Sequence, residues 1–132
     1  MAYQSELKVI TAAKKLASCV MTITQKSPKQ FRFSLVAKMQ TYVLDVVENL
    51  YRANEVFISS PDDIPNQVLR LRYQREAMTN LKLLCYMVQL SMEQQCIQPK
   101  QFEQISQQGL DCQNMLGAWM NSDRRRYASK NP

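Results

Sequence analysis

The stretch from Leu83 to Arg126 reads LLCYMVQLSMEQQCIQPKQFEQISQQGLDCQNMLGAWMNSDRRR. It begins with a strongly apolar helical segment, passes through a short turn that contains Pro99, and continues into a second amphipathic segment that ends in three arginines. This pattern predicts a helical hairpin with a cationic end. Nothing in it is typical of a catalytic site, so the sequence points to a protein that binds.

The composition of the whole chain favours an all-α protein. Of its 132 residues, 45% are hydrophobic, which is enough for one domain to bury a core without a metal or a disulfide. The only glycines, Gly109 and Gly117, are too few for hairpin turns or a phosphate-binding loop. Histidine, the usual general base and metal ligand, is absent. We therefore expect no catalytic residue, no metal, no cofactor and no small-molecule substrate.

Apolar residues recur at steps of three and four along four segments, which we expect to be helices. These segments are residues 5–24, 33–57, 66–92 and 99–121, separated by turns that contain proline. Short connections force neighbouring helices to be antiparallel, so residues 1–123 are expected to form an up-down-up-down four-helix bundle. Residues 124–132 are expected to form a basic, disordered tail.

The second predicted helix is apolar on two sides. One stripe extends from Val36 to Phe57, and a second stripe is formed by Leu35, Met39, Tyr42 and Val46. A helix with two apolar sides must bury both of them, either inside its own bundle or against another subunit. We expect the second stripe to contribute to an oligomer interface.

The cysteines and the N-terminal segment indicate a cytoplasmic protein. Cys19, Cys85 and Cys112 fall within apolar helical patterns, and none of the four cysteines forms a CxxC pair, which favours reduced core thiols over disulfides or zinc ligands. Residues 1–24 include several charged side chains, so they lack the uninterrupted apolar segment of a signal peptide or a membrane span. We expect no contact with a membrane.

Formal charge is distributed unevenly along a chain whose net charge is +6. Residues 1–38, 70–82 and 124–132 are basic, whereas residues 39–69 carry five acidic side chains and one basic one. If the first and third helices shared an outer surface, their cations would form one patch able to follow a phosphate backbone. The candidate phosphate ligands are Lys8, Lys14, Lys15, Arg70, Arg72, Arg75, Lys82, Arg124, Arg125 and Arg126. Ordinary solvated faces, or an acidic protein partner, are the alternatives.

The hairpin also carries a resemblance to a known family. An apolar third helix, a Pro-containing turn and a Gln-rich fourth helix lead to Met115-Leu116-Gly117-Ala118-Trp119-Met120 and a basic end. In this order, residues 69–126 resemble the small four-helix-bundle proteins encoded within ribosomal RNA intervening sequences. They look closer still to the accessory variability determinant proteins of diversity-generating retroelements.

The resemblance implies a homopentameric barrel with a positive surface that binds RNA or DNA. It also implies association with the retroelement's reverse transcriptase during mutagenic cDNA synthesis. The acidic residues Glu48, Glu55, Asp62 and Asp63 depart from a continuous positive surface. The alternative hypothesis is a helical-bundle assembly module without a nucleic-acid role, and an enzyme is the least favoured hypothesis.

Overall fold

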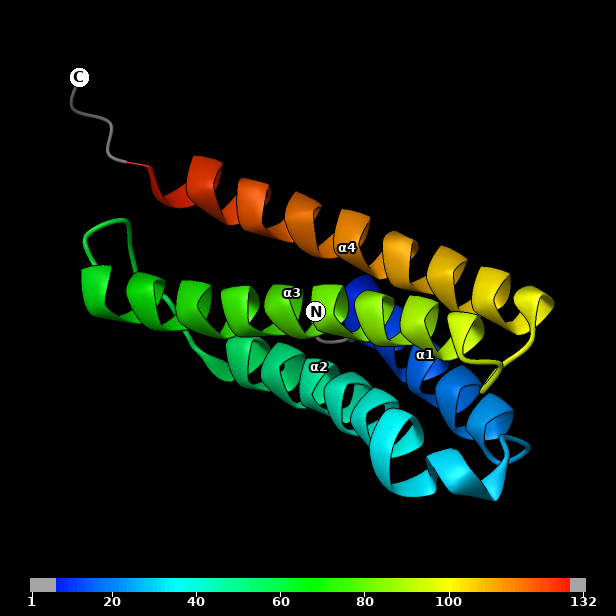
Figure 1. Ribbon diagram of the computed structural model, residues 1–132. Coiled ribbons are helices and arrows are strands. Elements are labelled where there is room, and N and C mark those ends of the chain that lie inside the picture. The colour runs from blue at the N-terminus through cyan, green and yellow to red at the C-terminus, as the bar shows by residue number, and fades with distance from the viewer. Residues whose placement is uncertain (1–6, 129–132) are drawn as a thin grey trace.

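The computed structural model describes residues 7–128, which form four long helices (Figure 1). These are α1 (Lys8–Thr24), α2 (Ala37–Glu55), α3 (Ile64–Glu93) and α4 (Pro99–Tyr127). A 3-10 turn, η1 (Lys29–Phe31), and a π-helical turn, η2 (Arg32–Val36), lead into α2. No strand occurs within residues 7–128. The predicted all-α class and the antiparallel four-helix bundle are confirmed.

Each helix buries one stripe of residues spaced alternately by about three and four. In α3 this stripe is Gln74, Ala77, Leu81, Leu84, Val88 and Ser91. In η2 and α2 it is Val36, Met39, Val43, Val46, Leu50 and Ala53. This spacing keeps one side of a helix directed at its neighbours when the axes are nearly parallel. The four stripes meet in a single core along the length of the bundle.

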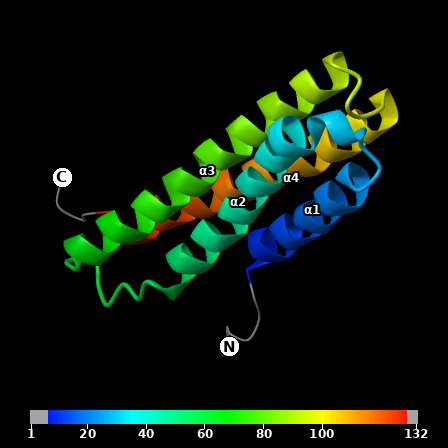
Figure 2. The same ribbon diagram turned by 60° about the horizontal axis from the view of Figure 1, so that its bottom comes forward.

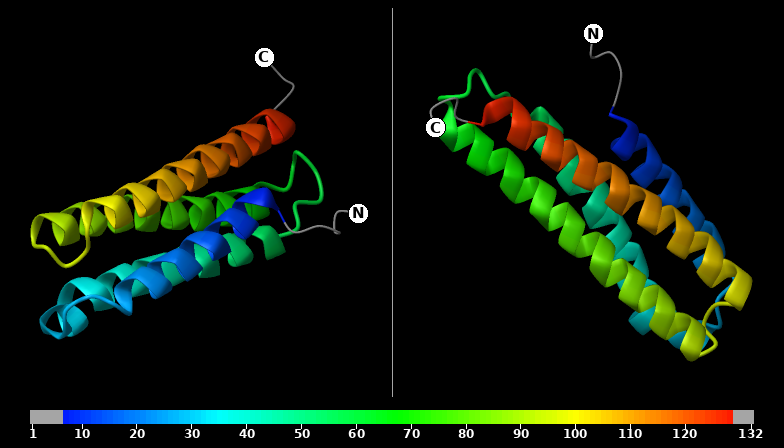
Figure 3. Two further views of the ribbon diagram at one scale, coloured as in Figure 1. Left: turned by 90° about the vertical axis from the view of Figure 1, so that its right-hand side faces the viewer. Right: turned by 90° about the horizontal axis from the view of Figure 1, so that it is seen from above.

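The order of the helices around the bundle decides whether the basic residues of α1 and α3 can share a surface. Both α2 and α4 pack against α1 and α3, so α1 and α3 lie diagonally across the bundle (Figure 3). Their basic residues therefore face different sides, so the condition for a single patch of α1 and α3 cations is not met. The α1–α2 and α3–α4 connections share one end of the bundle, and the α2–α3 connection lies at the other end (Figure 2). The start of α1 and the end of α4 lie at that second end (Figure 3).

Helix α3 begins two residues earlier than predicted because Asp63 caps it. The Asp63 carboxylate accepts a hydrogen bond from the Asn66 backbone N–H, and Pro65 occupies the first turn, where it displaces no helical hydrogen bond. Hydrogen bonds from Asn66 and Ser59 lower the pKa of the Asp63 carboxyl. The cap therefore favours the ionised side chain.

Two other predicted boundaries differ from the structure. Helix α4 continues to Tyr127, so Arg124, Arg125 and Arg126 belong to its last turn and not to a disordered tail. Helix α2 ends at Glu55, and Phe57, which was predicted to extend its apolar stripe, is 77% exposed. The predicted first residues of the first helix and the predicted tail beyond residue 128 lie outside the described part of the chain.

Candidate nucleic-acid interface

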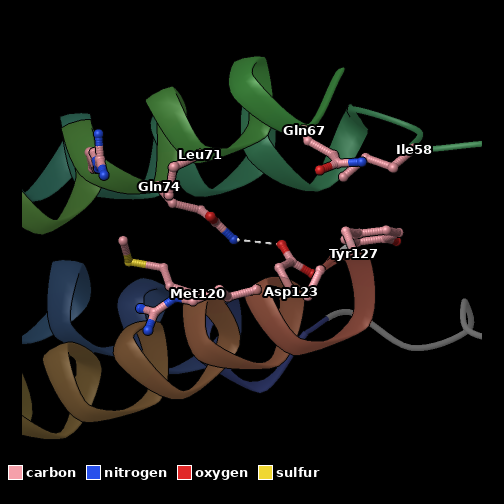
Figure 4. Close-up of a pocket in the computed structure, with 10 residues that line it drawn as sticks. Ile58, Gln67, Leu71, Gln74, Met120, Asp123 and Tyr127 are labelled. Atoms are coloured by element: carbon pink, nitrogen blue, oxygen red, sulfur yellow. Dashed lines mark hydrogen bonds between the residues drawn. The ribbon is translucent and has the colours of Figure 1, made fainter. Parts of the chain in front are cut away.

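A pocket of about 320 Å³ opens between the first turns of α3 and the last turns of α4 (Figure 4). Its apolar lining includes Ile58, Leu71, Met120 and Tyr127. Its polar lining includes Gln67, Gln74, Arg75, Asp123 and Arg124. Because the two helices are antiparallel, residues about 50 positions apart in the sequence line one depression.

An ion pair with a buried amide lies at the inner side of this pocket. Arg70 Nη1 donates to Asp123 Oδ1 at 3.0 Å. Gln74 Nε2 donates to Asp123 Oδ2 at 3.0 Å (Figure 4). Arg70 Nη2 also donates to the Val56 carbonyl at 2.8 Å, which ties the α2–α3 connection to both helices. The side chains of Arg70 and Asp123 are only 13% and 14% exposed. Arg70 therefore holds the bundle end together.

These contacts occupy Arg70, which was predicted as one of the phosphate ligands. Its guanidinium lies 5.9 Å from the ring centroids of both Trp119 and Tyr127, so aromatic side chains occupy the space around it. Two of its nitrogens are already bonded to Asp123 and Val56. A phosphate would have to displace these partners.

Other predicted cations do converge at this end of the α3–α4 face. Arg75 and Arg124 are exposed and line the same pocket from two helices. Arg72 is exposed one turn from Arg75, and the two also line an adjoining groove on α3. Arg125 and Arg126 follow on the exposed last turn of α4. Lys82 is exposed about two turns further along α3.

The predicted cations of α1 do not join this group on α3. Lys14 donates to the Tyr51 hydroxyl on α2 at 3.3 Å, and its ammonium lies 5.9 Å from the ring centroid. Lys15 is exposed on α1, which lies diagonally opposite α3. Lys8 is also exposed. It is the first residue of α1, and the start of α1 lies at the end of the bundle where α4 finishes (Figure 3).

Several of the acidic residues between positions 39 and 69 already have partners. Glu48 forms an ion pair with Arg52 at 3.0 Å, and Asp63 caps α3. Glu55 and Asp62 are exposed. The acidic segment therefore opposes the positive charge of Arg75 and Arg124 less than its formal charge indicates.

The expected oligomer interface changes in composition. Met39 and Val46 are completely buried in the core of the bundle, so their side chains are not accessible to another subunit. The face of α2 that packs into the core lies between the two stripes and takes Val36, Val43 and Leu50 from the first and Met39 and Val46 from the second. Leu35 and Tyr42 are only partly buried at the edge of the core and remain candidates for an interface.

The four cysteines are free thiols. Burial, with a smaller contribution from the charge of Asp111, raises the pKa of the Cys112 thiol to about 11. Burial also raises the pKa values of Cys85 and Cys19. Within residues 7–128, no three His, Cys, Asp or Glu side chains are grouped so that they could hold a metal ion.

Sequence reasoning did not identify the pocket walls. The available signal was the heptad spacing of α3, which places Arg70 and Gln74 in register with the core residues Ala77 and Leu81. Polar side chains at such positions require a partner across the bundle. Asp123 is that partner, but its choice depends on the antiparallel register of α3 and α4.

No protein-family model matches this chain, and no curated protein is detectably similar to it in sequence. Among the helices of residues 7–128, none has both the length and the apolar character needed to cross a membrane.

Proposed function

We propose that this protein is a non-enzymatic accessory subunit that binds RNA or DNA through phosphates at the α3–α4 end of its bundle. The observation that carries the proposal is the convergence of Arg75 and Arg124 on one pocket, with Arg72, Arg125 and Arg126 exposed on the same two helix ends. Arginine suits this role because its planar guanidinium binds phosphate oxygens in pairs. A helical scaffold fixes their spacing.

We further propose that the partner enzyme is the reverse transcriptase of a diversity-generating retroelement and that the bundle acts as a homo-oligomer, with five subunits expected. The resemblance of residues 69–126 to the accessory variability determinant proteins supports both parts. The first check is the gene neighbourhood, where a reverse-transcriptase reading frame and a template repeat are expected. Co-purification with that reverse transcriptase tests the partnership directly.

Binding through phosphates predicts a steep dependence on salt without a marked sequence preference. Each neutralised phosphate releases counterions, so the logarithm of the affinity falls against the logarithm of salt concentration by roughly 0.7 to 0.9 per contact. Charge reversal of Arg75 and Arg124 should remove about two contacts. It should therefore weaken binding to all sequences and flatten the slope by roughly 1.4 to 1.8.

The matched control reverses two exposed lysines that line neither the α3–α4 pocket nor the hollow beside the α1–α2 connection. Lys15→Glu with Lys100→Glu changes the net charge by the same amount as Arg75→Glu with Arg124→Glu. Fluorescence anisotropy with RNA, DNA and hybrid duplexes should show the larger loss for the arginine pair, with unchanged helical circular dichroism in both variants. Equal losses would point to net charge alone, and failure of the parent protein to bind at low salt would favour the assembly-module alternative.

One observation favours that alternative. Large apolar side chains are exposed on the outer faces of the helices and of the α2–α3 connection, notably Leu44, Phe57, Val68 and Tyr86. Such residues can dock against protein. An assembly module would bind its partner with little dependence on Arg75 and Arg124.

A further inference from the structure

The α1–α2 connection combines positive charge with an exposed aromatic ring. Residues 7–44 contain seven Lys and Arg side chains and no Asp or Glu. In the connection itself, Lys29, Arg32 and Phe33 are all exposed, and the Phe33 ring is the most exposed large hydrophobic side chain described, at 89%. Within residues 7–128, no other aromatic ring is as exposed as Phe33, and no acidic residue lies between Phe33 and its neighbouring cations in the sequence.

The backbone holds this connection in a defined shape. Successive turn hydrogen bonds link Lys26 N–H to the Ile23 carbonyl and Phe31 N–H to the Pro28 carbonyl. The π-helical turn η2 then contains a wider backbone turn than an α-helix. This geometry lets Phe31 pack against the core and Val36 enter it, while Phe33 between them faces solvent. The exposure of Phe33 is thus set by the backbone, and π-helical turns are frequent at functional sites.

Beside this ring lies a hollow of about 570 Å³. Lys29, Arg32 and Phe33 line it together with Ser27, whose hydroxyl oxygen is buried without a hydrogen-bond partner. At its inner side, Gln40 Nε2 donates to the Thr24 hydroxyl at 3.0 Å, which fixes the start of α2 against the end of α1. The hollow therefore offers two cations and an open aromatic ring.

We propose that this hollow binds an unpaired nucleotide, with the base stacked on Phe33 and the phosphate held by Lys29 and Arg32. Aromatic side chains stack on any exposed base, whereas the bases of a duplex already stack on one another. The site should therefore add affinity for single strands and little for duplexes. The inference deepens the proposed nucleic-acid binding and rests on it, but it concerns the opposite end of the bundle from Arg75 and Arg124.

The test compares Phe33→Ala with the matched control Phe57→Ala, which removes another exposed phenylalanine at the other end. Titration with a single-stranded oligonucleotide that contains 2-aminopurine reports stacking and affinity together. We expect Phe33→Ala to weaken single-strand binding about 10-fold and to abolish the stacking signal, with duplex affinity unchanged. Phe33→Trp should retain both, and Lys29→Gln with Arg32→Gln should flatten the single-strand salt slope.

Three results would overturn the inference. In the first, Phe33→Ala binds single strands as tightly as the parent protein does. In the second, it loses single-strand and duplex affinity equally, which would mean that the site does not recognise an unpaired base. A changed sedimentation coefficient for Phe33→Ala would instead assign Phe33 to a subunit contact. If these results appear while Arg75→Glu with Arg124→Glu still weakens binding and flattens the salt slope, only the inference about Phe33 fails. If the parent binds no nucleic acid, both proposals fail.

Discussion

At the scale of single residues, the feature that most distinguishes this bundle is a charged pair placed at core positions. Arg70 and Asp123 are nearly buried, and Gln74, which is only 1% exposed, bonds to the same carboxylate. Burying a charge is tolerated only when a partner is well placed, because desolvation opposes it. The pair therefore fixes the register of α3 against α4 more than it adds to the free energy of unfolding.

We expect removal of one partner of the Arg70–Asp123 pair to lower the free energy of unfolding strongly, and removal of both partners to lower it less. Asp123→Ala leaves the Arg70 guanidinium nearly buried and unpaired, so we expect a loss of about 2–3 kcal/mol in the free energy of unfolding, somewhat below the value for a fully buried pair. Arg70→Met with Asp123→Leu should lose less than Asp123→Ala. Urea unfolding of the single and double variants measures both quantities.

The control for this experiment is Asp111→Ala. Asp111 is exposed on the same helix and accepts a hydrogen bond from Gln107 at 3.1 Å. Its removal should change the free energy of unfolding by less than about 0.5 kcal/mol. If Asp123→Ala changed the free energy of unfolding as little as Asp111→Ala does, the Arg70–Asp123 pair would have to be solvated. It would then not set the register of α3 against α4.

At the scale of elements, the close approach of α3 and α4 depends on Gly109. A Cβ atom at this position would meet Cys85 Sγ at 3.2 Å, whereas one at Gly117 would meet nothing within 4 Å. Cys85 Sγ also accepts a hydrogen bond from Gln113 at 3.4 Å, so it is not free to move without loss. The two glycines of α4 thus have different roles, although both lie on the same helix.

We therefore predict opposite responses to alanine at these positions. Gly117→Ala should raise the free energy of unfolding by up to about 1 kcal/mol, because alanine restricts the unfolded chain and suits a helix. Gly109→Ala should give no gain or a loss, and the additional change Cys85→Ala should recover part of it by clearing the contact. Thermal and urea unfolding of the three variants check the signs. An equal gain at both positions would mean that α3 and α4 can separate without loss.

The four helices could be predicted from the sequence because apolar periodicity is local. The choice of buried face could not always be predicted in the same way. Val68 continues the apolar spacing of α3 but is 59% exposed, because Arg70 and Gln74 take the neighbouring core positions and bond to Asp123 across the bundle. On α2, two apolar stripes were visible, and only the packing of its neighbours decides that Met39 and Val46 face inward.

The same is true of the candidate site: features local in the sequence could be predicted, and contacts between helices could not. The basic segments were visible in the sequence, and so was the presence of the arginines at residues 124–126. The proximity of the arginines on α3 to those on α4 could not be predicted, because it follows from the order of the helices around the bundle, which sets α3 beside α4 and opposite α1. Phe33 was missed because its exposure arises from the π-helical turn η2, which periodicity based on α-helices does not anticipate.

At the scale of the whole molecule, the two proposed contacts lie at opposite ends of a long bundle. Helix α3 has 30 residues and spans about 45 Å, and Arg75 lies about 27 Å before its last residue. Sites this far apart share no side chains, so losses at Phe33 and at Arg75 with Arg124 should add when the variants are combined. A single strand bound at both ends would have to follow the outside of the bundle.

The last prediction concerns assembly, which is one part of the proposed function. We expect the protein to sediment as an oligomer, near five times its monomer mass of 15.4 kDa. Leu35→Gln with Tyr42→Gln should dissociate that oligomer while the helical circular dichroism persists, because both side chains lie at the partly exposed edge of the core. Met39→Gln with Val46→Gln is the matched comparison, and it should unfold the bundle, because both side chains are completely buried. A parent protein that sediments as a monomer at micromolar concentration would remove the oligomer from the proposal. Nucleic-acid binding would then have to be carried by one bundle, with the Arg75 and Arg124 variants still deciding whether the α3–α4 end is the site.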